Sequence, residues 1–260
     1  MRRVLAVLAA ATLLSTQASA IVTRHDVDKS AYDADEADFP ALASLYSSPD
    51  GRRDCVATLI APDWVITAKH CVADDALDAR IAAGEFAITF AEGREAIVTR
   101  IERMPDLEGP VQRSDIALLQ LASPIEDIEP VPFYEGGDEL GRVMFFAGWG
   151  GTGTGIEGVS SEDGAFRIAE NRVDSVFDNF LVFRFDDPRT HLDRALPLEG
   201  ISGPGDSGGP ALVPTPHGCA IAGISSAQRT YDAKEGTYNV DEYYVRISAA
   251  REWIDSVIDG

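Results

Sequence analysis

Ser207 is the residue of this sequence best suited to act as a nucleophile. It lies in the string Gly203-Pro-Gly-Asp-Ser-Gly-Gly-Pro210, where four glycines and two prolines impose a tight backbone. Such a turn makes backbone N–H groups converge, and amide hydrolysis needs these donors because negative charge develops on oxygen in the tetrahedral intermediate. The N–H groups of Gly205 and Ser207 are the predicted donors. A string rich in glycine and serine is often only a structural turn, but this order of residues favours a turn that carries a catalytic serine.

A serine hydroxyl is a poor nucleophile until a base takes its proton, and His70 is the predicted base. It follows the apolar run Val65-Ile-Thr-Ala, whereas the remaining histidines lie in polar or turn contexts and are expected at the surface: His25, His191 and His217. Asp115 precedes the apolar run 116–121, where a carboxylate is costly unless it has a partner. His70 would be that partner, and Asp115 would hold its imidazole in the required tautomer.

The first twenty residues predict a secretory signal peptide. Arg2 and Arg3 precede an apolar run over 4–14, and Ala18-Ser-Ala20 is a small-residue cleavage signal. The apolar run is too short to span a bilayer, and a buried N-terminal helix is the alternative. We therefore expect a secreted protein, extracellular or periplasmic, after cleavage behind Ala20.

The charge of the chain argues against two classes of partner. Lysine and arginine number 22 against 43 acidic residues, which gives a formal net charge of −21. Such a surface repels nucleic acid and anionic membranes, so neither is expected as a partner. Solubility or the attraction of basic substrates would explain the excess of acid, and the 45% of hydrophobic residues is enough for a sizeable core.

Short apolar runs broken by turn residues indicate an all-β chain. Eight runs have this character: 57–61, 65–68, 96–101, 116–121, 143–148, 180–185, 220–225 and 243–247. No 15-residue helical pattern separates them, which argues against a parallel sheet with crossover helices.

The segments between these runs have their own signatures. Residues 23–38 are acidic and read as an extended surface segment, and residues 150–164 as a mobile loop. Residues 122–142, rich in proline and glycine, are the predicted linker between two β halves. Apolar residues recur at helical spacing near the end of the chain, and they predict a terminal helix that Ser248 caps: Trp253, Ile254, Val257 and Ile258.

Three segments together resemble the trypsin-like, chymotrypsin-fold serine peptidases. They are Thr67-Ala-Lys-His-Cys71, Ser114-Asp-Ile-Ala-Leu-Leu-Gln-Leu121 and Gly205-Asp-Ser-Gly-Gly-Pro210, in the order of that family. The resemblance implies two six-stranded antiparallel β-barrels with a Ser-His-Asp triad in the cleft between them. Residues 21–134 would form the first barrel, and residues 135–260 the second barrel with the C-terminal α-helix.

The resemblance also implies an activity. It suggests an endopeptidase that cleaves proteins or peptides through an acyl-enzyme intermediate and needs no cofactor for catalysis. A monomer is expected. A catalytically weak or inactive protein of the same fold, which acts as a binding module, is the main alternative, and an esterase of another fold is a third reading.

Further positions fit the same family. Cys55 and Cys71 match the disulfide that staples the histidine loop, which leaves Cys219 free. Ser226 resembles the serine that lines the substrate strand. Other matches are the start of the second barrel and the terminal segment: Gly148-Trp-Gly150, Tyr244, Trp253 and Ile254.

The substrate pocket departs from that of trypsin itself. The family reads the side chain before the cleaved bond with a residue six before the nucleophile, which is Ile201 here, with Ser202 beside it. An apolar base argues against simple trypsin specificity. Glu242 falls at another pocket-wall position and would restore a negative charge that favours Arg or Lys. A solvated or internally paired carboxylate is the alternative.

The stretch 84–95 is similar to the calcium loop of the family. Its carboxylates and two backbone carbonyls would form the all-oxygen cage that calcium prefers: Glu85, Glu92 and Glu95 with Ala87 and Phe90. Coincidence in so acidic a chain is the alternative. A bound ion would add stability and take no part in the chemistry.

Zymogens of this family mature when cleavage frees an Ile-Val terminus, whose ammonium pairs with the aspartate before the nucleophile. Cleavage behind Ala20 would leave Ile21 at the N-terminus with no propeptide, so export itself would activate the enzyme through an Ile21–Asp206 ion pair. The family's Ile-Val-Gly-Gly start is changed here, and extra residues precede Pro40. The alternative is that residues 23–39 route the terminus elsewhere.

Overall fold

The computed structural model describes residues 18–19, 21–47, 53–106, 114–177, 179–216 and 218–260. The predicted signal peptide therefore falls outside the described residues except for Ala18 and Ser19, and His217 falls outside them as well. No helix in the described ranges has the length and apolarity needed to cross a membrane.

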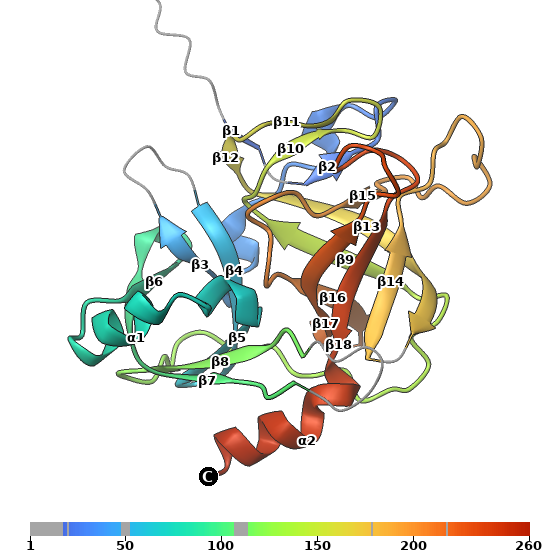
Figure 1. The fold of residues 1–260 in the computed structure, drawn as a ribbon. Helices are drawn as coiled ribbons and strands as arrows, with labels where there is room; N and C mark the ends of the chain where they lie inside the picture. Colours follow the sequence, from blue (N-terminus) through green and yellow to red (C-terminus); the bar gives the residue numbers. More distant parts are fainter. Residues whose placement is uncertain (1–17, 20, 48–52, 107–113, 178, 217) are drawn as a thin grey trace, which may run out of the picture.

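Two closed six-stranded antiparallel barrels lie side by side (Figure 1). The first follows the order β3-β4-β5-β8-β7-β6. Its strands are β3 (Leu42–Ser47), β4 (Arg53–Ala61), β5 (Trp64–Thr67), β6 (Ala87–Phe90), β7 (Glu95–Arg103) and β8 (Ala117–Leu121). The all-β prediction and the two-barrel expectation are confirmed, and an esterase of another fold is excluded.

The second barrel follows the order β13-β14-β18-β17-β16-β9. Its strands are β9 (Val143–Gly148), β13 (Arg167–Phe177), β14 (Phe180–Arg184), β16 (Pro210–Thr215), β17 (Gly218–Arg229) and β18 (Asp241–Arg246). All eight predicted runs lie on strands of the two barrels. The longest strand that they miss is β13, because its buried positions alternate with Glu170, Arg172 and Asp174 and produce no continuous apolar run.

Short strands join the N-terminal segment to the second half of the chain. They form a four-stranded sheet, β11-β10-β2-β15, and a two-stranded one, β1-β12. Their bounds are β1 (Ala18–Ser19), β2 (Val22–Thr23), β10 (Thr152–Thr154), β11 (Gly158–Ser161), β12 (Gly164–Ala165) and β15 (Gly200–Ile201). The predicted mobile loop over 150–164 is therefore mostly paired strand, because long-range pairing with β2 supplies partners that its glycine-rich sequence does not reveal.

The acidic segment after β2 is more structured than the sequence suggests. It contains two 3-10 turns, Lys29–Ala31 and Glu36–Asp38, which the side chains of Asp28 and Asp35 cap. Tyr32 between them is fully buried, and its hydroxyl donates to the carbonyl of Glu199, 3.0 Å away. This segment is anchored to the second half of the chain, where the sequence predicts an extended surface stretch.

Helices are few in the described part of the chain. The α-helices are α1 (Asp75–Ala82) and α2 (Ile247–Ile258), and further 3-10 turns cover Lys69–Val72 and Ala91–Gly93. The terminal helix is confirmed, and Ile247, Ala250 and Ile254 bury one of its faces. The predicted cap is wrong: α2 begins at Ile247, Arg246 is its N-cap without a side-chain hydrogen bond, and Ser248 lies in the first turn.

Candidate active site

His70 and Asp115 meet because adjacent strands of the first barrel deliver them. His70 lies in the 3-10 turn that follows β5, Asp115 lies just before β8, and Thr67 of β5 pairs with Ala117 of β8. The Nδ1 atom of His70 is 2.7 Å from Oδ2 of Asp115, and the backbone N–H of His70 donates to Oδ1 at 2.8 Å. These two contacts fix both the position and the tautomer of the imidazole.

The second barrel contributes to the same pair through Ser226 on β17. Its hydroxyl donates to Oδ2 of Asp115 at 2.7 Å. Burial alone would raise the pKa of Asp115, but hydrogen bonds from His70 and Ser226 hold that pKa below its ordinary value. The hydrogen bond to Asp115 raises the pKa of His70 above 6.5, against the opposing effect of burial. The carboxylate therefore stays ionised and stabilises an imidazolium.

Ser207 lies in the tight turn between β15 and β16, next to the histidine loop. Its carbonyl oxygen accepts a hydrogen bond of 2.7 Å from the N–H of Val56 on β4, which ties the turn to the first barrel. That oxygen is 3.7 Å from Sγ of Cys71, and the same sulfur is 3.8 Å from Nε2 of His70. Within the described residues Ser207 makes no direct side-chain hydrogen bond with His70, as is common before a substrate tightens such contacts.

The disulfide between Cys55 and Cys71 is present, and Cys219 is a free, exposed thiol, as the resemblance implies. The bond joins β4 to the 3-10 turn that carries His70. It therefore restrains the loop that carries His70 against β4, whose Val56 N–H donates to the carbonyl of Ser207.

The backbone around Ser207 offers two unused donors. Gly205 has φ of +98°, a conformation that glycine adopts without steric cost. Among the described residues, neither the N–H of Gly205 nor that of Ser207 donates to a protein acceptor, whereas the N–H groups of Asp206, Gly208 and Gly209 do. The two predicted oxyanion donors are thus free to bind a developing negative charge.

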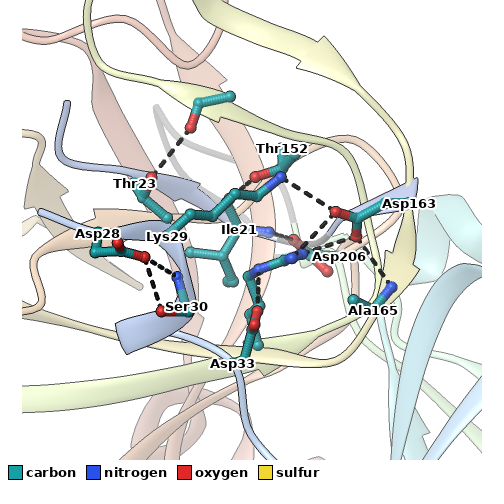
Figure 2. Close-up of polar contacts among 12 residues, drawn as sticks. Ile21, Thr23, Asp28, Lys29, Ser30, Asp33, Thr152, Asp163, Ala165 and Asp206 are labelled. Atoms are coloured by element: carbon teal, nitrogen blue, oxygen red, sulfur yellow. Dashed lines mark hydrogen bonds and ion pairs between the residues drawn. The ribbon is translucent and has the colours of Figure 1, made fainter. Parts of the chain in front are cut away.

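Asp206 lies behind this turn, buried to 2% exposure. Its carboxylate accepts hydrogen bonds from the N–H groups of Gly150 at 2.7 Å and Gly203 at 2.9 Å. The N–H of Ile21 donates to the same carboxylate at 3.3 Å (Figure 2). A Cβ at Gly150 would lie 2.6 Å from the nitrogen of Asp206, which explains the glycine after Trp149. Burial raises the pKa of Asp206 to about 6, so a cation beside it would be strongly favoured.

The extra residues after Ile21 are pinned in place. Lys29 lies 3.1 Å from Asp163, and Arg167 pairs with both Asp163 and Asp33 (Figure 2). The hydroxyl of Thr152 donates to the carbonyl of Ile21 at 2.5 Å. In this arrangement the added segment does not carry Ile21 away from Asp206.

A small cavity of about 100 Å³ opens beside Ser207. Ser202, Ser226 and Glu242 line it, as the sequence predicts for the substrate pocket. Glu242 is 1% exposed, and each of its carboxylate oxygens lies 3.2 Å from the N–H of Ser202, which donates to it. The Ser202 hydroxyl lies 2.7 Å from that of Tyr244, so the pocket wall is a connected polar network.

Comparisons with known proteins agree with this geometry. The sequence matches the trypsin family over residues 29–178, more than half of the chain. The chain belongs to the trypsin family. The matched range contains His70 and Asp115 and ends before Ser207.

Curated relatives cover more of the chain. A trypsin of Saccharopolyspora erythraea is 27% identical over 185 residues, which are 70% of this chain and 79% of that protein. A trypsin of Phaedon cochleariae is 25% identical over 223 residues, covering 77% of each chain. Cathepsin G of Mus musculus is 27% identical over 227 residues, covering 83% of this chain and 79% of the relative.

Ile201 does not line the cavity beside Ser207, although the resemblance to the trypsin family puts it at the base of the substrate pocket. It is fully buried, it is not among the residues that line the cavity, and it packs with an apolar cluster: Val22, Phe185, Tyr238 and Val240. The reason is that β15 pairs with β2, where Ile201 is opposite Val22. Ile201 thus supports the N-terminal segment, and Glu242 and Ser202 form the wall of the pocket.

Gln228 is a pocket residue that the sequence analysis missed. It lines the cavity, and its amide bonds to Ser202 and Gly236. A signal existed in the sequence, since residues two apart on a strand share a face and Gln228 follows Ser226 by two. The alternation alone does not show which polar side chain turns inward, because the strand has an irregular register beside Ser225.

The predicted calcium loop forms the hairpin of β6 and β7. Among its described residues, no three acidic side chains bring their ligand oxygens within 4.8 Å of one another. Glu85, Glu92 and Glu95 are therefore not gathered around one point, and calcium would have to draw them together with the carbonyls of Ala87 and Phe90. Calcium binding here stays a prediction, which a calcium-dependent rise in Tm would support.

Proposed function

We propose that this trypsin-family protein is a secreted serine endopeptidase that cleaves proteins or peptides. Ser207 attacks the scissile carbonyl, and His70 takes its proton and later passes it to the leaving amine. Asp115 stabilises the imidazolium that forms, and the N–H groups of Gly205 and Ser207 bind the oxyanion. No cofactor takes part in these steps, and the protein is expected to act as a monomer.

The observation that carries this proposal is the hydrogen-bonded chain from Ser226 through Asp115 to His70. In this chain a partly buried, ionised carboxylate lies behind an imidazole whose second nitrogen faces the disulfide next to Ser207. A structural histidine in a surface loop would not need a carboxylate held by donors from both barrels. This arrangement supports general-base catalysis at Ser207.

Space for an extended peptide supports the cleavage of internal bonds. A cavity of about 360 Å³ adjoins Gly205 and is lined by Arg53 and Trp149. Another, of about 570 Å³, adjoins His70 and Ser226. A substrate chain therefore finds room on either side of the bond that Ser207 would attack.

The decisive test replaces the nucleophile and the base separately. Ser207→Ala and His70→Ala should each lower kcat by roughly 10⁴-fold or more with an unchanged circular dichroism spectrum. His191→Ala is the matched control, because that histidine is exposed and distant from the triad in sequence. Near-normal peptidase activity in folded Ser207→Ala would refute the proposal.

The binding-module alternative predicts a different outcome. A fluorophosphonate labels a serine only where a base activates it, so covalent labelling of Ser207 that requires His70 would support an enzyme. Absence of labelling in the folded, mature protein that begins at Ile21 would favour the binding module.

A further inference from the structure

The cavity beside Ser207 is much smaller than its neighbours. It measures about 100 Å³, against about 360 Å³ and 570 Å³ for the two that adjoin it. Because it touches both Ser207 and Ser226, it is where the side chain before the scissile bond would enter. Its shape therefore limits which residue can precede the cleaved bond.

The side chain of Gln228 spans this cavity. Its Nε2 donates to the carbonyl of Ser202 at 2.8 Å, and its Oε1 accepts from the N–H of Gly236 at 3.2 Å. Ser202 follows β15, whereas Gly236 lies in the loop between β17 and β18, so the amide joins two separate walls. Displacing the side chain of Gln228 would leave the carbonyl of Ser202 and the N–H of Gly236 without their hydrogen-bond partner. This loss makes the bridge costly to open.

Two acidic residues line this cavity: Glu235, which is exposed, and Glu242, which is buried. Glu242 is buried and forms no ion pair with any described lysine, arginine or histidine. Burial above all, together with the nearby negative charges of Asp206 and Glu235, raises its pKa to about 8. A cationic substrate side chain would thus meet the amide of Gln228 and the protonated carboxyl group of Glu242, and Glu235 is the exposed acid of the lining.

We infer that Gln228 closes the deep part of the pocket, so that the enzyme cleaves after small, uncharged side chains such as alanine and serine. This inference rests on the proposed peptidase function and names its substrate class. Large aromatic residues are excluded because the bridge occupies their space. Arginine and lysine are excluded because the bridge leaves too little depth for their long side chains, so they cannot reach Glu242, and the exposed Glu235 alone does not provide that depth.

The test uses the mature protein and peptide 4-nitroanilides that differ only in the residue before the scissile bond: Ala, Ser, Phe and Lys. The native enzyme should cleave the Ala and Ser substrates roughly 100-fold better in kcat/KM than the Phe or Lys substrates. Gln228→Gly should raise the Phe and Lys values at least about tenfold relative to Ala, because it opens the pocket. Gln228→Ala, which keeps a side chain on the strand, should act in the same direction.

Arg229→Ala is the matched control, since its exposed side chain is the next one along β17 and does not line the cavity. It should leave the ratios unchanged. A native preference for Lys, Arg or Phe, or unchanged ratios in folded Gln228→Ala and Gln228→Gly, would overturn the inference. Fluorophosphonate labelling of Ser207 separates the two failures: labelling with the wrong preference refutes only the pocket assignment, and no labelling refutes the peptidase as well.

Discussion

The backbone nitrogen of Ile21 lies 3.3 Å from Oδ2 of Asp206, although 185 residues separate them in sequence. Ile21 is fully buried, and Asp206 adjoins both proposed oxyanion donors along the chain. A free amine at Ile21 would place its positive charge directly against a buried carboxylate. Ile21 is therefore coupled physically to the turn that holds Ser207.

This coupling predicts that activity depends on the exact N-terminus. Protein that begins at Ile21 should be active, whereas protein with one additional alanine before Ile21 should fold but lose roughly 100-fold or more in kcat/KM, since breaking a buried ion pair costs about 3–5 kcal/mol. Trimming the alanine with an aminopeptidase should restore the rate. Asp206→Asn should mimic the extended form. Equal activity of the extended and native proteins would show that the Ile21 terminus does not control the site.

The pH dependence of the rate should report the His70–Asp115 pair. The base must be neutral, so kcat/KM should rise with pH through the pKa of His70, which the hydrogen bond to Asp115 holds above 6.5. Asp115→Asn removes the charge responsible, so this acid limb should move to lower pH while the plateau rate falls by roughly 10⁴-fold. Initial rates from pH 5 to 9 measure both effects. An acid limb that stays in place would argue that His70 is not the titrating base.

Loss of the disulfide should weaken the fold around the histidine loop. The bond joins cysteines 16 positions apart, and closing a loop of that length stabilises a protein by roughly 3 kcal/mol in chain-entropy estimates. The double variant Cys55→Ala with Cys71→Ala should lose about this much free energy of unfolding in urea. Cys219→Ser is the control and should change it little, because that thiol is exposed and unpaired. A double variant as stable as the native protein would contradict the expectation.

Glu242 should make the protein less stable as the pH rises. Burial raises its pKa from 4.5 to about 8, so between these values the folded protein holds a proton that the unfolded chain releases. The free energy of unfolding therefore falls with pH across this window, and Glu199 acts in the same direction. Glu242→Gln should remove part of this slope, so its stability relative to the native protein should increase from pH 5 to pH 8.

Urea unfolding at unit intervals of pH measures this difference directly. Glu126→Gln provides the control, because Glu126 is exposed in the loop after β8 and should leave the slope unaltered. A difference between Glu242→Gln and the native protein that stays constant with pH would mean that Glu242 is already ionised in the fold.

Local patterns were sufficient for much of the fold and for the candidate catalytic residues. Apolar runs predicted strands such as β8, which is buried on both faces, because consecutive apolar residues are visible in the sequence itself. The strings around His70, Asp115 and Ser207, with Cys55 and Cys71, could be recognised because each is short and contiguous. The same holds for α2, which the spacing of Trp253, Ile254, Val257 and Ile258 predicted, although only Ile254 of these four is fully buried.

Only the tertiary structure decided what depends on partners far away in the chain. The glycine-rich stretch after Gly150 forms a strand because β10 pairs with β2. On its other edge β2 pairs with β15, and this second pairing buries Ile201 away from the pocket. The role of Gln228 depends on Ser202 and Gly236, which approach it from other segments. A sequence carries the propensity of each segment, but side-chain direction and the partners of buried polar groups are set by which segments pack together.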